Sequence, residues 1–227
     1  MSTPGPRERL ELLFALGLGA SLLSLVLFAW LADQVAGGAT IAFDAAVRSY
    51  VHQKASPGLT SVMRFMSDLG APGSLLLFAI AALVGFRRLG WNRAAVRFLI
   101  TVAGGFLLDV TLKLAFHRTR PVSFFGTPLP RSFSFPSGHA MFSVCLFGAL
   151  AALITARVLG PKARAAIWTV TVAVAFLIGL SRIYLGVHYP SDVLAGYAAA
   201  VVWVGTVAWA DRVLQKRRRR NLEPRES

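Results

Sequence analysis

Six long apolar stretches run through this chain, and they restrict its possible folds more than any other feature. A helix needs about 20 mostly apolar residues to cross the hydrocarbon core of a bilayer. Hydrophobic residues make up 56% of the 227 residues, which is too many for an ordinary soluble domain. The stretches are residues 10–32, 71–86, 94–116, 138–157, 165–182 and 192–211. We therefore predict an all-α membrane protein, in which residues 1–227 form one domain built on a bundle of six transmembrane helices.

The formal net charge of +14 would suit a nucleic-acid-binding protein, but the distribution of the charge favours another interpretation. Basic residues gather before span one, between spans two and three, between spans four and five, and after span six. If the spans alternate in direction, all these segments lie on one side, as the positive-inside rule expects of the cytoplasm. We predict an integral membrane protein with both termini cytoplasmic and no nucleic-acid partner. The basic tail of about 212–227 would then lie against anionic lipid headgroups.

Residues 33–70 form the longest predicted segment outside the membrane, on the side opposite the basic loops. Apolar side chains recur there at helical spacing, at Phe43, Ala46, Val47, Tyr50 and Val51. The pattern predicts a short amphipathic helix at the membrane interface between spans one and two. Two interpretations stay open: the helix packs as a cap over the bundle, or it guides a lipid toward a site.

The first polar motif begins in the last turn of span three and reads Lys113-Leu-Ala-Phe-His-Arg-Thr-Arg120-Pro121. Lys113 and Arg120 are seven residues apart, nearly two helical turns, so a continuing helix would hold both on one face. Pro121 lacks an N–H group and would end that helix. Taken alone, the two cations would be interpreted as side chains that reach to the membrane interface.

Three neighbours of these cations receive separate interpretations. Asp109 lies inside span three, one turn before Lys113. Because an intramembrane carboxylate is a functional candidate by default, we interpret Asp109 as a partner that restrains Lys113. His117 and Arg118 lie in the loop before Arg120, and we interpret them as interfacial rather than catalytic.

The second motif, Pro136-Ser137-Gly138-His139, opens span four. Proline and serine suit the start of a helix, and glycine lets the backbone approach a ligand closely. The first free N–H groups of a helix, together with the positive end of its dipole, favour an anion. Capping explains the proline and the serine, but it does not explain a titratable His139 at the mouth of the same helix.

The third motif begins with Ser181-Arg182 at the end of span five and continues to His188 and Asp192. A carboxylate at Asp192, in the first turn of span six, can accept a hydrogen bond from an imidazole N–H. That bond would set the tautomer of His188 and leave its other nitrogen free to attack. An isolated His–Asp pair is most often structural, but three cations and a second histidine favour catalysis here.

Together the three motifs resemble the signature of the type 2 phosphatidic acid phosphatase superfamily, which also includes acid phosphatases and vanadium haloperoxidases. The resemblance covers about residues 60–210, and the six-span layout is similar to that of small bacterial members, which implies a bacterial inner-membrane protein. It implies that His188 attacks phosphorus and forms a phosphohistidine, that Asp192 orients it, and that His139 protonates the leaving oxygen. It also implies five groups that bind the phosphoryl oxygens, at Lys113, Arg120, Ser137, Gly138 and Arg182.

The resulting hypothesis is a hydrolase without metal or cofactor that removes phosphate from a membrane lipid phosphate or diphosphate at the outer face. Undecaprenyl diphosphate, phosphatidate and phosphatidylglycerol phosphate stay open as substrates, as does the oligomeric state. Two alternatives use the same cations: a lipid phosphotransferase and a transporter of a phosphorylated solute. A transporter predicts charges at the membrane midplane and broken spans there. Apart from Asp109, the sequence places its motif charges at one rim instead.

Overall fold

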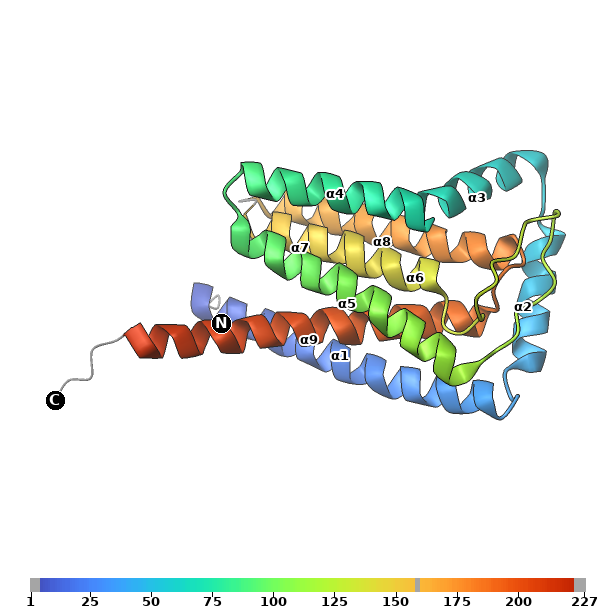
Figure 1. Ribbon diagram of the computed structural model, residues 1–227, viewed down its shortest axis with the longest axis horizontal. Coiled ribbons are helices and arrows are strands. Elements are labelled where there is room, and N and C mark those ends of the chain that lie inside the picture. Colours follow the sequence, from blue (N-terminus) through green and yellow to red (C-terminus); the bar gives the residue numbers. More distant parts are fainter. Residues whose placement is uncertain (1–4, 158–159, 223–227) are drawn as a thin grey trace.

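The computed structural model describes residues 5–157 and 160–222, and this part of the chain is helical without any strand. Most of its helices run along one common direction and form a bundle (Figure 1). In chain order they are α1 (Pro6–Ala36), α2 (Ile41–Gln53), α3 (Pro57–Leu69), α4 (Pro72–Arg88), α5 (Asn92–Phe116), α6 (Gly138–Ser143), the π-helical turn Val144–Gly148, α7 (Ala149–Thr155), α8 (Pro161–Tyr184) and α9 (Pro190–Leu222).

Five segments of the described chain are long and apolar enough to cross a membrane on their own. They are Phe14–Ala36, Asn92–Phe116, Gly138–Thr155, Pro161–Tyr184 and Pro190–Arg218. The predicted span at 71–86 corresponds to α4, whose 17 residues qualify only together with α3, across a bend of 53°. The all-α membrane bundle is therefore confirmed, and it has six spans if this bent pair counts as one.

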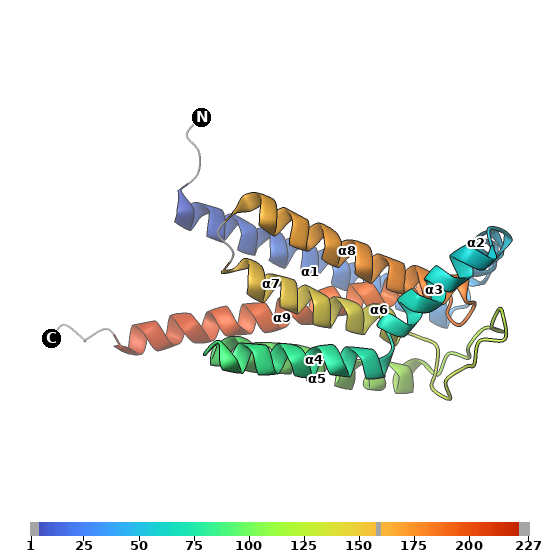
Figure 2. The ribbon, with the colours of Figure 1, turned by 90° about the horizontal axis from the view of Figure 1, so that it is seen from above.

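The fourth span lies at the centre of the bundle. In its most apolar window 56% of the residues are buried, against 11% for the first span. Both views show α6 and α7 running in the middle of the other helices (Figures 1 and 2). Because α6 begins at Gly138, the second motif lies where this central helix emerges from the bundle.

The two ends of the bundle differ in what they carry. The turn between α4 and α5 and the C-terminal part of α9 lie at one end, whereas α2, α3 and the long loop before α6 lie at the other (Figure 1). The helix α9 continues through the predicted basic tail as far as Leu222, and residues 223–227 lie outside the described part. All three motifs lie at the end of the bundle that α2 crosses (Figure 1).

The predicted amphipathic helix is α2, and its polar side faces the loops. Asp44 is fully buried, whereas Tyr50 is 62% exposed. Arg48 donates hydrogen bonds to the carbonyls of Val122, at 2.7 Å, and Gly186, at 3.2 Å. These contacts tie together the two loops that carry the first and third motifs, so they favour a cap over the bundle as the interpretation of α2.

Candidate active site

His188 lies in the connection between α8 and α9, and its side chain is almost completely buried. Its Nδ1 is 3.2 Å from Oδ2 of Asp192, and its Nε2 is 2.9 Å from Nη1 of Arg120. A guanidinium group can only donate hydrogen bonds, so Nε2 is the acceptor in this contact. The ring proton therefore belongs on Nδ1, toward the carboxylate. This tautomer presents the lone pair of Nε2 to the side where the cations lie.

The surroundings of His188 keep its ring neutral at neutral pH. Burial lowers the pKa of His188 from its ordinary 6.5 to about 4. The hydrogen bond and the charge of Asp192 act to raise that pKa, and the charges of Arg120 and Arg182 act to lower it further. A carboxylate beside a histidine would by itself favour the protonated ring, so burial and the two cations are what keep a nucleophilic nitrogen available.

Asp192 has more hydrogen-bond donors around it than its motif predicts. Its Oδ2 accepts from the hydroxyl of Ser134 at 2.5 Å and from the backbone N–H of Tyr189 at 2.9 Å. Its Oδ1 accepts from Nη1 of Arg118 at 2.6 Å. Together with His188, these donors enclose a carboxylate that has no exposed surface. Its orientation is therefore set by the loop before α6 as well as by α9.

The prediction that Arg118 is an interfacial residue is wrong. Its side chain is only 13% exposed and bridges two buried carboxylates, Asp192 at 2.6 Å and Asp44 of α2 at 2.8 Å. Asp44 also accepts hydrogen bonds from the hydroxyl and the backbone N–H of Ser191. The guanidinium group lies 4.1 Å from the centre of the Tyr189 ring. The sequence carries no signal for this network, because Asp44 precedes Arg118 by 74 residues and no motif links the two.

Lys113 is buried near the end of α5, where it joins two parts of the site. Its Nζ lies 2.5 Å from Oδ1 of Asp109 and donates to the carbonyl of Pro136 at 2.8 Å. A Cβ atom at position 138 would lie 3.2 Å from that same Oδ1. The absence of a side chain at Gly138 therefore leaves room for the carboxylate that restrains the lysine.

The spacing of Lys113 and Arg120 predicts that they share one helical face, and the structure shows that they do not. The helix α5 ends at Phe116, and His117 adopts the left-handed conformation with φ 47°. That residue turns the chain one turn before Pro121 could end the helix. The guanidinium of Arg120 is instead held by the loops, through the carbonyls of Ser132, Phe133 and Val187. Arg120 therefore contacts His188 from the loop after α5 and not from the helix itself.

Two of the predicted phosphate-binding residues carry buried polar atoms that lack a hydrogen-bond partner among residues 5–157 and 160–222. These atoms are Oγ of Ser137 and Nε of Arg182. The other side of the Arg182 guanidinium is occupied, since Nη1 donates to the hydroxyl of Ser67. Buried polar atoms are hydrogen-bonded in the great majority of cases, so each exception needs an explanation. A phosphoryl oxygen would satisfy both a hydroxyl and a guanidinium N–H.

His139 lies in the first turn of α6 and is partly buried. Four groups lie close enough to act on its ring electrostatically, namely the cations Arg182, Arg120 and Lys113 and the imidazole of His188. The three motifs therefore bring two imidazoles and three cations to the same end of the bundle. Binding of phosphate by these residues stays a prediction, but their convergence is a property of the fold.

Comparison with known proteins gives matches over much of the chain. It is 31% identical to phosphatidylglycerophosphatase B of Bacillus subtilis over 167 residues, which cover 72% of this chain and 81% of that protein. It is 28% identical to an undecaprenyl-diphosphatase of Sulfolobus acidocaldarius over 168 residues, covering 72% of this chain and 76% of the relative.

A solved structure and a family model agree with these relatives. The crystal structure of a transmembrane PAP2-type phosphatidylglycerolphosphate phosphatase from Bacillus subtilis superimposes with a TM-score of 0.76. The superposition covers 85% of this chain and 96% of that one, at 29% identity. The model of the PAP2 superfamily matches residues 94–215, which contain all three motifs. The resemblance of the motifs is thus confirmed, and this multi-pass membrane protein belongs to the PAP2 superfamily.

Proposed function

We propose that this protein removes phosphate from a membrane lipid phosphate or diphosphate by forming a covalent phosphohistidine on His188. The geometry of that residue carries the proposal, because a buried neutral imidazole has its proton held by Asp192 and its lone pair directed to Arg120. The names of the relatives, a phosphatidylglycerophosphatase and an undecaprenyl-diphosphatase, support a lipid phosphate as the substrate class.

In the proposed first step, Nε2 of His188 attacks phosphorus and the bond from phosphorus to the leaving oxygen breaks. His139 gives its proton to that oxygen, and Asp192 stabilises the charge that develops on the ring. The phosphoryl group enters between His188 and Arg120, so the guanidinium transfers its hydrogen bond from Nε2 to a phosphoryl oxygen. Phosphoryl transfer depends mainly on positioning and charge stabilisation, which preplaced cations can supply.

In the second step, water attacks phosphorus and the bond to Nε2 breaks, which regenerates the neutral imidazole. His139, deprotonated by the first step, accepts the proton of the attacking water. Lys113, Arg120 and Arg182 face the same phosphoryl oxygens in both steps. An alcohol of another lipid in place of water would give a phosphotransferase with the same residues.

We further propose that the site faces the periplasmic or extracellular side of a bacterial inner membrane and that both termini are cytoplasmic. The basic loops at the opposite end of the bundle support this orientation through the positive-inside rule. A site at the end of the transmembrane helices would receive the headgroup of a lipid while its tails stay in the hydrocarbon. Phosphatidylglycerol phosphate, phosphatidate and undecaprenyl diphosphate all fit this arrangement.

The first test is release of phosphate by the purified protein in detergent. We expect release from lipid phosphates that continues unchanged after treatment with EDTA, because the three cations take the place that a metal ion would have. A panel of phosphatidylglycerol phosphate, phosphatidate and undecaprenyl diphosphate, compared by kcat/KM, would then identify the preferred lipid. Flux of a phosphorylated solute into vesicles without any release would overturn the proposal in favour of a transporter.

The pH dependence of kcat/KM offers a second test. Because burial lowers the pKa of His188 to about 4, the ring stays neutral until the pH falls to that value. We expect kcat/KM to fall on the acid side near pH 4. It should not fall near pH 6.5, the ordinary pKa of histidine, because the ring of His188 is still neutral there. Circular dichroism at each pH would separate this fall from acid unfolding. A fall near pH 6.5 in protein that stays folded would contradict the assigned state of His188.

Asp109 provides a third test, since it touches Lys113 rather than the space for the substrate. Asp109→Asn keeps the size of the side chain but removes the charge that holds the lysine 2.5 Å away. We expect kcat/KM to fall about tenfold through misplacement of Lys113. Thr111→Val, an exposed position on the same helix, is the matched control and should retain full activity. Equal activity of the Asp109 variant and the wild type would refute the positioning role.

A further inference from the structure

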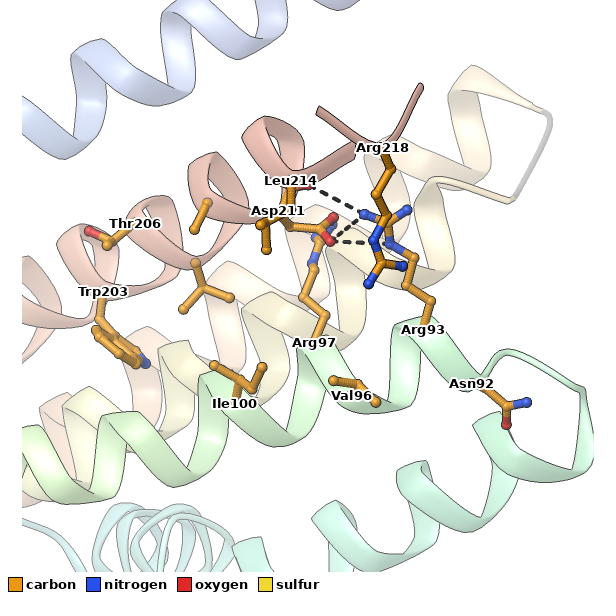
Figure 3. A pocket seen from close by; sticks show the side chains of 12 residues that line it. Asn92, Arg93, Val96, Arg97, Ile100, Trp203, Thr206, Asp211, Leu214 and Arg218 are labelled. Atoms are coloured by element: carbon orange, nitrogen blue, oxygen red, sulfur yellow. Dashed lines mark hydrogen bonds and ion pairs between the residues drawn. The ribbon is translucent and has the colours of Figure 1, made fainter. Parts of the chain in front are cut away.

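A groove of about 520 Å³ lies between α5 and α9 at the end of the bundle opposite His188 (Figure 3). None of the residues that line it belongs to the three motifs. Both helices are candidate membrane spans, so the groove lies along the lipid-facing side of the protein. The proposed catalytic reaction does not use this groove, and its chemistry therefore needs a separate explanation.

One end of the groove is strongly basic. Arg93 lies 2.6 Å from one carboxylate oxygen of Asp211, and Arg97 lies 3.6 Å from the other. Arg218 reaches the same place from the next turns of α9, and Figure 3 shows its guanidinium beside that carboxylate. In the described part of the chain, Arg218 forms no salt bridge. Three arginines thus face a single carboxylate, and positive charge is in excess.

The start of α5 adds to this positive potential. The helix begins at Asn92, which lines the groove beside Arg93. The first N–H groups of a helix have no partner within the helix, and the helix dipole places partial positive charge there. An anion at this end would therefore meet the guanidinium groups of Arg97 and Arg218 and the positive end of a long helix.

The other end of the groove is apolar and rigid. Ile100, Val207 and the ring of Trp203 line it, and in Figure 3 the tryptophan lies at the end away from the arginines. The indole N–H of Trp203 donates to the carbonyl of Thr101 at 2.8 Å, which fixes the ring. The ring also lies against Gly104, where a Cβ atom would collide with it. The apolar half is therefore a preformed surface, because packing and one hydrogen bond hold the Trp203 ring in place.

We propose that this groove binds an anionic phospholipid from the leaflet opposite the candidate active site. Its phosphate would lie between Arg97 and Arg218, and one acyl chain would follow Ile100 and Trp203 toward the middle of the bilayer. A basic pocket between transmembrane helices at the membrane edge is the arrangement that recognises acidic headgroups. A zwitterionic lipid fits less well, because its headgroup cation would lie against the arginines. A free anion also fits less well, because it would leave the apolar half of the groove uncovered.

Native mass spectrometry of the full-length protein in detergent tests this proposal, with phosphatidylglycerol as the probe and phosphatidylcholine of the same chains as the comparison. We expect one saturable phosphatidylglycerol site and about tenfold weaker binding of phosphatidylcholine. The Arg97→Gln/Arg218→Gln variant should lose about tenfold in affinity for phosphatidylglycerol. The Arg87→Gln/Arg88→Gln control removes two exposed arginines at the same end but outside the groove, and it should bind like the wild type.

Equal binding of the two lipids would overturn the proposal, and so would equal losses in the groove variant and its control. An equal loss of binding in Arg120→Gln would also overturn it, because that result would place the lipid headgroup in the candidate active site. Formation of a dimer whose interface covers the groove would identify a second copy as the occupant instead. Arg218→Gln alone leaves the Asp211 ion pairs intact, so its weaker binding would support the site even if the double variant failed to fold.

Discussion

His188→Ala is expected to abolish phosphate release, with a loss of roughly 10⁴-fold or more in kcat. The variant removes the lone pair that attacks phosphorus, and no other imidazole in the described chain is held between a carboxylate and a guanidinium. Since the side chain is buried, the variant also leaves Arg120 and Asp192 without one partner each. Thermal unfolding must therefore be measured beside activity, to show that the loss is chemical.

The chain offers a matched control for this variant in His117. That residue lies at the same end of the bundle, and its ring packs against Phe133 at 4.6 Å between centres. His117→Asn removes the imidazole but tolerates the left-handed conformation that turns the chain at this position, so this variant should keep most of the activity. Rapid quenching of the wild type under alkaline conditions should reveal a protein heavier by one phosphoryl group, and His188→Ala should lack it. Residual activity above about a hundredth of the wild type would exclude obligatory attack by His188.

Arg118→Gln is expected to have the largest effect on stability together with a large effect on activity. The substitution leaves Asp44 and Asp192, both fully buried, without the cation that bridges them. Breaking a buried ion pair by removing one partner costs about 3–5 kcal/mol in the free energy of unfolding. Asp192 would then tend to take up a proton and hold His188 less firmly. We expect kcat to fall by about two orders of magnitude as a result.

A double-mutant cycle distinguishes this network from general damage to the loop. Asp44→Asn added to Arg118→Gln removes one of the two uncompensated charges, so it should recover part of the lost stability. Arg131→Gln, an exposed position in the same loop, should change neither the melting temperature nor kcat. Strictly additive effects of the substitutions at positions 44 and 118 would show that the bridge between them does not contribute.

The spans and the three motifs were predictable because their signals are local in the chain. Length and hydropathy alone define a transmembrane helix, since the bilayer leaves no other partner for the backbone N–H and C=O groups. Asp109 and Lys113 are four residues apart in one helix, whose geometry brings them together. His188 and Asp192 are also four residues apart, across the turn that leads into the first turn of α9. Both contacts can therefore be anticipated without knowledge of the packing.

The supporting contacts could not be predicted, because they join segments that only the packing of the helices brings together. Arg118 lies in the loop after α5 and pairs with Asp44, which belongs to the distant helix α2. The contact forms because α2 turns its polar side toward that loop. Arg120 reaches His188 from a loop, since His117 ends the helix early. The groove between α5 and α9 likewise depends on two helices far apart in sequence. Periodicity and spacing describe each helix alone, whereas these features follow from the relative positions of several helices and loops.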